Sequence, residues 1–203
     1  LKGPPHRRRR LAMAGHHDAS MPESWRPLFR YVMLATSLSF FNRAMSTPFL
    51  PLVLADDFGQ PASAVGLTLA MFPVGVLLAT SWACRAARGV QRIVHFHSLA
   101  IGGMAATALL FAACGELLPV IGAVPATVLV ACLRALQGAA QALYMAANTS
   151  LITRRFDGMV PYVVGMAEVA VGSGAQLGRL SGGFLYDAGG LACPYLLVAL
   201  VQG

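Results

Sequence analysis

The chain has 203 residues, of which 57% are hydrophobic and 11% are charged. An ordinary soluble domain carries about 25% charged residues, because it needs them to cover its surface. The composition therefore argues against a soluble enzyme, a disordered protein and a disulfide scaffold, and it predicts an all-α integral membrane protein with several spans. The formal net charge of +7, taken alone, would suggest nucleic acid or acidic lipid as a partner.

Residues 1–27 form a segment of different composition, with consecutive arginines from Arg7 to Arg10. The segment holds no apolar run long enough for the core of a secretory signal. We expect a basic cytosolic tail here, with an arginine-rich targeting peptide as the alternative. Because the chain begins with leucine rather than methionine, we also expect an incomplete or misplaced start, with Met13 or Met21 as the alternative first residue.

Six apolar stretches follow the tail, and all but the last are long enough to cross a bilayer core of about 30 Å as a helix. The expected spans are about 31–54, 63–83, 93–114, 124–148, 160–186 and 190–203. The sixth is cut short by the end of the chain. Because the connections are short, consecutive helices must run antiparallel. Residues 28–203 therefore predict a bundle of six transmembrane helices.

Charged residues separate by loop along this bundle. Twelve of the 15 lysines and arginines lie in the tail, at the start of the first span and in the loops 84–92 and 149–159, whereas the alternate loops hold acids and no bases. Positive charge stays on the cytoplasmic side of short membrane loops. The pattern predicts a cytoplasmic N-terminus and makes the bilayer, not nucleic acid, the partner of the +7 charge. It does not distinguish the plasma membrane from a vesicle or organelle membrane.

Ionisable residues inside spans are costly, and they usually face a bundle interior or an aqueous cavity. This chain has Arg43, Arg134, Glu168 and Arg179 in such positions. Glu168 is the only carboxylate among them and is a candidate for proton coupling or substrate binding, with a structural ion pair to Arg134 as the alternative. Arg179 lies about 16 Å further along the same helix, which is too far to bond Glu168 directly.

Asn42 and Arg43, followed by Pro48 and Pro51, predict a break midway along the first span. Interrupted helices often line transport sites, so Asn42 and Arg43 are site candidates, and a kinked helix in which Arg43 pairs or reaches the interface is the alternative.

Small residues recur at four-residue spacing in two spans. The first set is Gly138, Ala142 and Ala146, and the second is the doubled ridge Gly174, Gly178 and Gly182. Such ridges let a neighbouring backbone approach closely. We expect the second ridge to pack against another span, either at a surface where bundle halves slide or at a static packing face.

No residues have the spacing of a metal site, a nucleotide loop or a catalytic nucleophile. His95 and His97 stand at the start of the third span without acidic partners, and we expect them to face the headgroups. We therefore predict no enzyme activity, no cofactor and no metal.

The motifs of the fourth and fifth spans carry a family resemblance. Arg134-x-x-Gln137-Gly138 resembles the fourth-helix motif of the major facilitator superfamily, and the run that ends at Gly178, Gly182 and Gly183 resembles its antiporter motif. The stretches 48–52, 64–67, 77–79 and 168–186 look most like the branch of vesicular amine and polyamine transporters. The resemblance covers about 45–203 and implies the amino-terminal half of a twelve-helix carrier.

Three departures from the family pattern stand out. Arg179 replaces the proline that normally follows Gly178, the loop around Ala86 lacks the usual acid, and the first span lacks the carboxylate with which vesicular carriers hold an ammonium group. A cationic substrate would then depend on Glu168, and an anionic one on the intramembrane arginines.

The resemblance implies a secondary transporter that moves a small organic solute by alternating access, coupled to protons. Two six-helix bundles are needed for this, so we expect a fragment of a protein roughly twice as long, inactive without its C-terminal six-helix half. The alternative is a non-transporting membrane scaffold or receptor on the same fold, favoured by the departures at Arg179 and around Ala86.

Overall fold

The computed structural model describes residues 21–89, 91–115 and 118–202, and within these residues every regular element is helical. The six long helices are α2 (Arg26–Met45), α4 (Ala62–Gly89), α5 (Ile93–Gly115), α7 (Ala123–Arg155), α8 (Val160–Gly189) and α9 (Ala192–Gln202). The predicted all-α fold with six long helices is confirmed. Most of the predicted basic tail lies outside the described residues.

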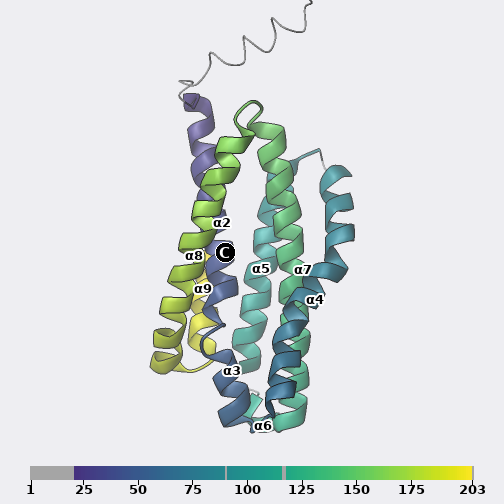
Figure 1. Cartoon of the computed structure of the whole chain (residues 1–203), viewed down its shortest axis with the longest axis vertical. Coiled ribbons are helices and arrows are strands. Elements are labelled where there is room, and N and C mark those ends of the chain that lie inside the picture. Colours follow the sequence, from purple (N-terminus) through teal and green to yellow (C-terminus); the bar gives the residue numbers. More distant parts are fainter. Residues whose placement is uncertain (1–20, 90, 116–117, 203) are drawn as a thin grey trace, which may run out of the picture.

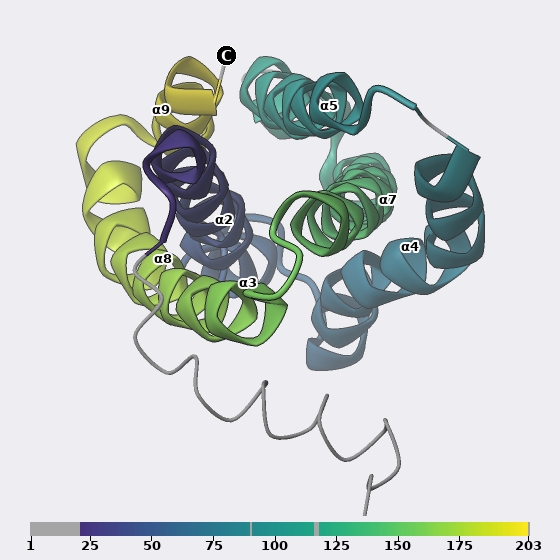
Figure 2. The same ribbon diagram turned by 90° about the horizontal axis from the view of Figure 1, so that it is seen from above.

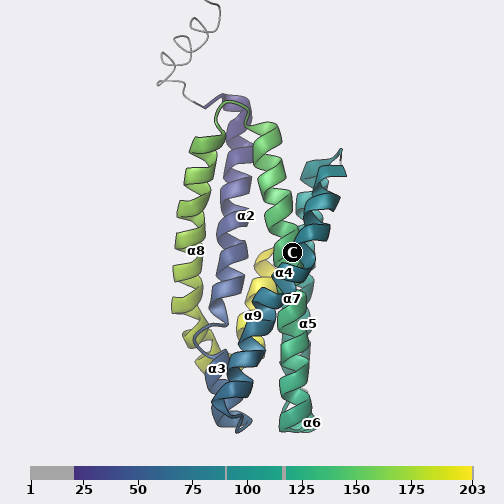
Figure 3. The same ribbon diagram turned by 45° about the vertical axis from the view of Figure 1, so that its right-hand side comes forward.

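The six helices run up and down along the long axis of the molecule (Figure 1). α2 packs on α8, α4 packs on α7, and α5 lies against both α7 and α9. Seen from above, α8, α2, α7 and α4 form a curved row, and α5 and α9 lie behind it (Figure 2). α4 contains Pro73 and is bent (Figure 3), as expected for a proline that removes one backbone hydrogen bond.

The distribution of polarity is the reverse of that in a soluble protein. Large apolar side chains such as Leu78 and Phe184 are exposed, whereas Asn42, Arg134 and Gln137 are buried. α4, α5 and α7 are long and apolar enough to cross a membrane, and α9 is an apolar helix of shorter length. α2 has 20 residues and α8 has 30, but their charged and small residues make them less apolar. An apolar exterior around a polar interior fits an integral membrane protein.

The first predicted span is divided, and the break lies beyond the predicted place. α2 continues through Asn42 and Arg43 to Met45, a turn follows over 46–49, and the short helices α3 (Leu50–Leu52) and η2 (Val53–Asp57, a π-helix) complete the segment. The predicted break at Asn42-Arg43 is therefore wrong. Pro48 accounts for the turn, because it lacks the backbone donor that would continue α2. Pro51 stands in the first turn of α3, where a missing donor is tolerated.

Basic and acidic residues gather at opposite ends of the bundle. Arg154 at the end of α7 donates to the backbone oxygens of Ala87 and Arg88 at 3.1 and 2.9 Å, which joins the two basic loops. At the other end the Tyr186 hydroxyl donates to Asp57 at 3.2 Å. This arrangement is the one that alternating loops require, although Glu116 lies outside the described residues.

The glycine ridge of α8 lies directly against α2. A Cβ atom at Gly174 or Gly182 would overlap a backbone carbonyl of α2, and one at Gly178 would lie 2.5 Å from the carbonyl oxygen of Phe41. Gly183 faces open space, so it is not part of this contact. The second close approach joins α4 and α7, where Gly138 lies against the Phe72 carbonyl. Absent side chains at these positions let the backbones of α2 and α8, and those of α4 and α7, pack closely in two pairs.

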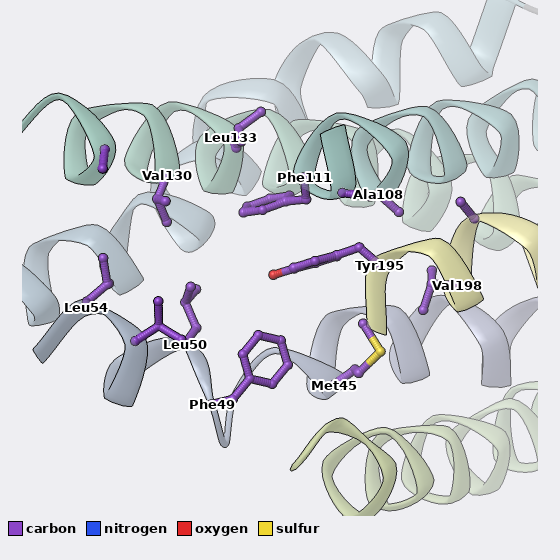
Figure 4. Packing of buried hydrophobic residues seen from close by; sticks show 14 of the residues in the cluster. Met45, Phe49, Leu50, Leu54, Ala108, Phe111, Val130, Leu133, Tyr195 and Val198 are labelled. Atoms are coloured by element: carbon purple, nitrogen blue, oxygen red, sulfur yellow. The ribbon is translucent and has the colours of Figure 1, made fainter. Parts of the chain in front are cut away.

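An apolar cluster closes the acidic end of the bundle (Figure 4). Tyr195 of α9 is fully buried there and stacks on Phe111 of α5 with ring centroids 4.5 Å apart. Its other side meets the edge of Phe49, which belongs to the turn before α3. The cluster fixes the segment after α2 and with it the end of the helix that carries Asn42 and Arg43.

Candidate functional site

Buried polar side chains join α2, α7 and α9. Arg134 of α7 donates from Nη1 to Ser46 Oγ at 2.8 Å and to Gln137 Oε1 at 2.9 Å. The Gln137 amide donates to Asn42 Oδ1 at 3.1 Å, and Asn42 donates to Gln202 Oε1 of α9 at 3.3 Å. Arg134 is 6% exposed and Asn42 is 0% exposed. The predicted candidates Asn42, Arg134 and Gln137 therefore belong to one network.

A cavity of about 420 Å³, the arginine pocket, opens beside this network between α2, α4, α7 and α8. Arg43, Arg134 and Arg179 all line it, together with Phe72. The guanidinium carbons of Arg43 and Arg134 lie 5.1 and 5.3 Å from the centroid of the Phe72 ring, which is cation–π distance. Arg43 and Arg179 are exposed, and Arg134 is buried at the base.

None of the three guanidinium groups forms an ion pair with a carboxylate of the described residues. The Nε atom of Arg134 is buried and has no hydrogen-bond partner among these residues. The ring of Phe72 and the polar groups of Ser46 and Gln137 orient the charge of Arg134 without neutralising it.

Glu168 lies on α8 like Arg179, but in a different place. It is exposed and lines a separate cavity of about 200 Å³ with Thr36, Tyr144 and Asn148. Among the described residues it forms no ion pair with Arg134. The sequence leaves a pair between Glu168 and Arg134 open as an alternative, and the structure does not bring the two residues together.

His97 lies in a position that differs from the one expected from the sequence. It is fully buried, so the expectation that it faces the headgroups is wrong, whereas His95 is exposed. Its Nδ1 shares a hydrogen bond with the Tyr31 hydroxyl at 3.0 Å, and its Nε2 shares one with Asn148 Oδ1 at 3.2 Å. Two polar partners from α2 and α7 satisfy both ring nitrogens, and these hydrogen bonds offset the cost of burying the imidazole inside the bundle.

Further contacts between α2 and α7 complete the polar interior. Tyr144 donates to Thr36 at 3.0 Å, and Ser39 donates to Gln141 at 3.2 Å. The sequence could have predicted these contacts, because polar residues recur every three or four positions along both segments. The two sets are Thr36, Ser39 and Asn42 on α2 with Ser46 directly after its end, and Gln137, Gln141, Tyr144 and Asn148 on α7. Such spacing predicts one polar face on each helix.

No three His, Cys, Asp or Glu side chains converge on a metal-binding geometry within the described residues. The chemistry that the site offers is a buried hydrogen-bond network that holds Arg134, and positive charge that lines a cavity.

Residues 32–202 match the family model described as Major Facilitator Superfamily, and the chain belongs to this superfamily of membrane transport proteins. No curated protein and no solved structure matches the chain.

Proposed function

We propose that this protein moves a small organic solute across a membrane by alternating access, as a proton-coupled secondary transporter of the antiporter type. The observation that carries the proposal is the arginine pocket, a charged cavity built by four helices of a bundle whose exterior is apolar. Charged and polar groups in such positions are expensive, and a solute pathway is what they most often serve.

Alternating access needs a second bundle that rocks against the first. We propose that these six helices work with a C-terminal six-helix half, which would cover the side of the arginine pocket that α4 and α8 flank. The charge pattern of the loops supports an orientation with the N-terminus in the cytoplasm. Glu168, exposed on α8 beside Thr36 and Asn148, is the proposed proton-coupling residue.

The resemblance to vesicular amine and polyamine transporters favours an amine as one candidate substrate. A non-transporting scaffold or receptor is the competing function, and Arg179 in the place of the family's proline is the observation that favours it. A scaffold, a receptor and a transporter would all fold as a membrane bundle, so only a flux measurement separates the transporter from the other two.

The test is solute-dependent proton flux. The complete carrier, with its second bundle, is reconstituted in liposomes that contain a pH-sensitive dye, and amines, organic anions and amino acids are added in turn. We expect at least one class to change the internal pH, with no change in protein-free liposomes. Absence of flux and of counterflow with every class would contradict the transport proposal and support the scaffold.

A further inference from the structure

We propose that the arginine pocket binds a small organic anion whose carboxylate groups are held by Arg43, Arg134 and Arg179. This inference rests on the proposed transport function and adds the class of substrate. It differs from the amine that the branch resemblance favours.

The charge of the pocket is unbalanced. Three guanidinium groups from α2, α7 and α8 line one cavity, no carboxylate lines it, and none pairs with them among the described residues. The buried charge of Arg134 is destabilising without a counter-charge, and a bound anion offsets it. The planar guanidinium also matches a carboxylate with two parallel hydrogen bonds, a geometry that lysine does not provide.

The hydrogen bonding of Arg134 is incomplete. Ser46 and Gln137 occupy only Nη1, while Nε is buried without an acceptor. Phe72 sits against both Arg134 and Arg43, so the ring holds the two guanidinium groups near one another despite their repulsion. An aromatic ring weakly substitutes for a counter-ion. A carboxylate in the pocket would be a true counter-ion for both guanidinium groups.

The shape of the cavity also suits a small anion. Arg134 is fixed at the base, whereas Arg43 and Arg179 are exposed long side chains at the rim. They can fold over a ligand without moving a helix. The remaining wall includes the apolar residues Leu69, Val171 and Ala175, and the volume of about 420 Å³ suits a short carbon skeleton with charged ends.

An amine fits this pocket poorly. It would meet three like charges, and the one carboxylate within the predicted spans, Glu168, lines the other cavity. The same residues that attract a carboxylate therefore discriminate against an ammonium group.

The experiment measures binding and transport on the complete carrier in phosphatidylcholine membranes. The probes are acetate, lactate, succinate and citrate, with spermidine and dopamine as amines. We expect a carboxylate to bind and to be transported, and we expect Arg43→Gln and Arg179→Gln each to weaken its binding by about tenfold to a hundredfold, the loss of one charged hydrogen-bond partner. Arg85→Gln, at the exposed end of α4, is the matched control and should leave affinity unchanged.

Each other outcome overturns a defined part of the account. Transport of amines alone, with no carboxylate bound, overturns the anion proposal and leaves the transport function standing. Carboxylate binding that Arg43→Gln and Arg179→Gln do not weaken overturns the assignment to this pocket. If added phosphatidylglycerol displaces the carboxylate, a lipid headgroup is the anion that the pocket binds, and the proposal of an anionic solute is overturned. If no solute of either class is moved, the proposed function itself fails.

Discussion

Replacement of Gly178 by alanine perturbs the contact of α8 with α2, the two helices that carry Arg179 and Arg43. The new Cβ atom would lie 2.5 Å from the carbonyl oxygen of Phe41, whereas ordinary contacts begin at 3.4 Å. A backbone carbonyl inside a helix cannot rotate away, so the helices must separate by about 1 Å, and a gap of that size forfeits a quarter to a half of the dispersion energy of each contact. Overpacking of this kind costs about 1–3 kcal/mol.

The assay is thermal unfolding of the complete carrier in detergent, followed by tryptophan fluorescence. We expect a lower midpoint for Gly178→Ala than for the wild type. Gly183→Ala is the matched control, because Gly183 lies on the same helix and has open space around its Cβ position. Alanine is the better helix former by about 1 kcal/mol, so this control should be neutral or slightly stabilised. Equal midpoints for the two variants would refute the tight helix crossing.

Two further changes test the buried residue His97 and the proposed coupling residue Glu168. His97→Ala removes the hydrogen-bond partner of Asn148 Oδ1, whereas the Tyr31 hydroxyl keeps its contact with Ser98. The amide oxygen left without a partner should lower the free energy of unfolding by about 1–3 kcal/mol. His95→Ala, at an exposed position, should have no effect in the same unfolding assay, and equal losses would contradict the buried contacts of His97. Glu168→Gln should abolish the pH dependence of solute flux in liposomes without preventing folding, because the side chain is exposed. An unchanged pH profile would remove Glu168 as the coupling residue.

The helical architecture could be predicted from the sequence because it depends on length and hydropathy, which are local properties. The first span shows the limit of this reasoning. Asn42 and Arg43 look like helix breakers in an apolar stretch, but Asn42 is satisfied by side chains from Gln137 and Gln202, which lie far away in sequence. The backbone of α2 therefore stays helical there, and only Pro48, which follows, interrupts it.

The candidate site divides in the same way. Position within a span singled out Arg43, Arg134 and Arg179, but their convergence on one cavity depends on how four helices pack. The separation of Arg134 from Glu168 also follows from this packing, because a sequence gives depth along a helix and not the direction in which a side chain points. The burial of His97 cannot be predicted from the sequence for the same reason, because its partners Tyr31 and Asn148 come from other helices.

The central claim is that solute binds in the arginine pocket, and a single cysteine at Ala175 tests it most directly. Ala175 lines the pocket on α8, and Gln91, exposed in the loop between α4 and α5, provides a control position. Both cysteines are introduced into the complete carrier after its native cysteines have been replaced, and their labelling by a membrane-impermeant maleimide is timed with and without the transported solute. The account predicts that solute slows labelling at Ala175→Cys and not at Gln91→Cys. Equal labelling rates at Ala175→Cys with and without a solute that the same preparation transports would contradict it.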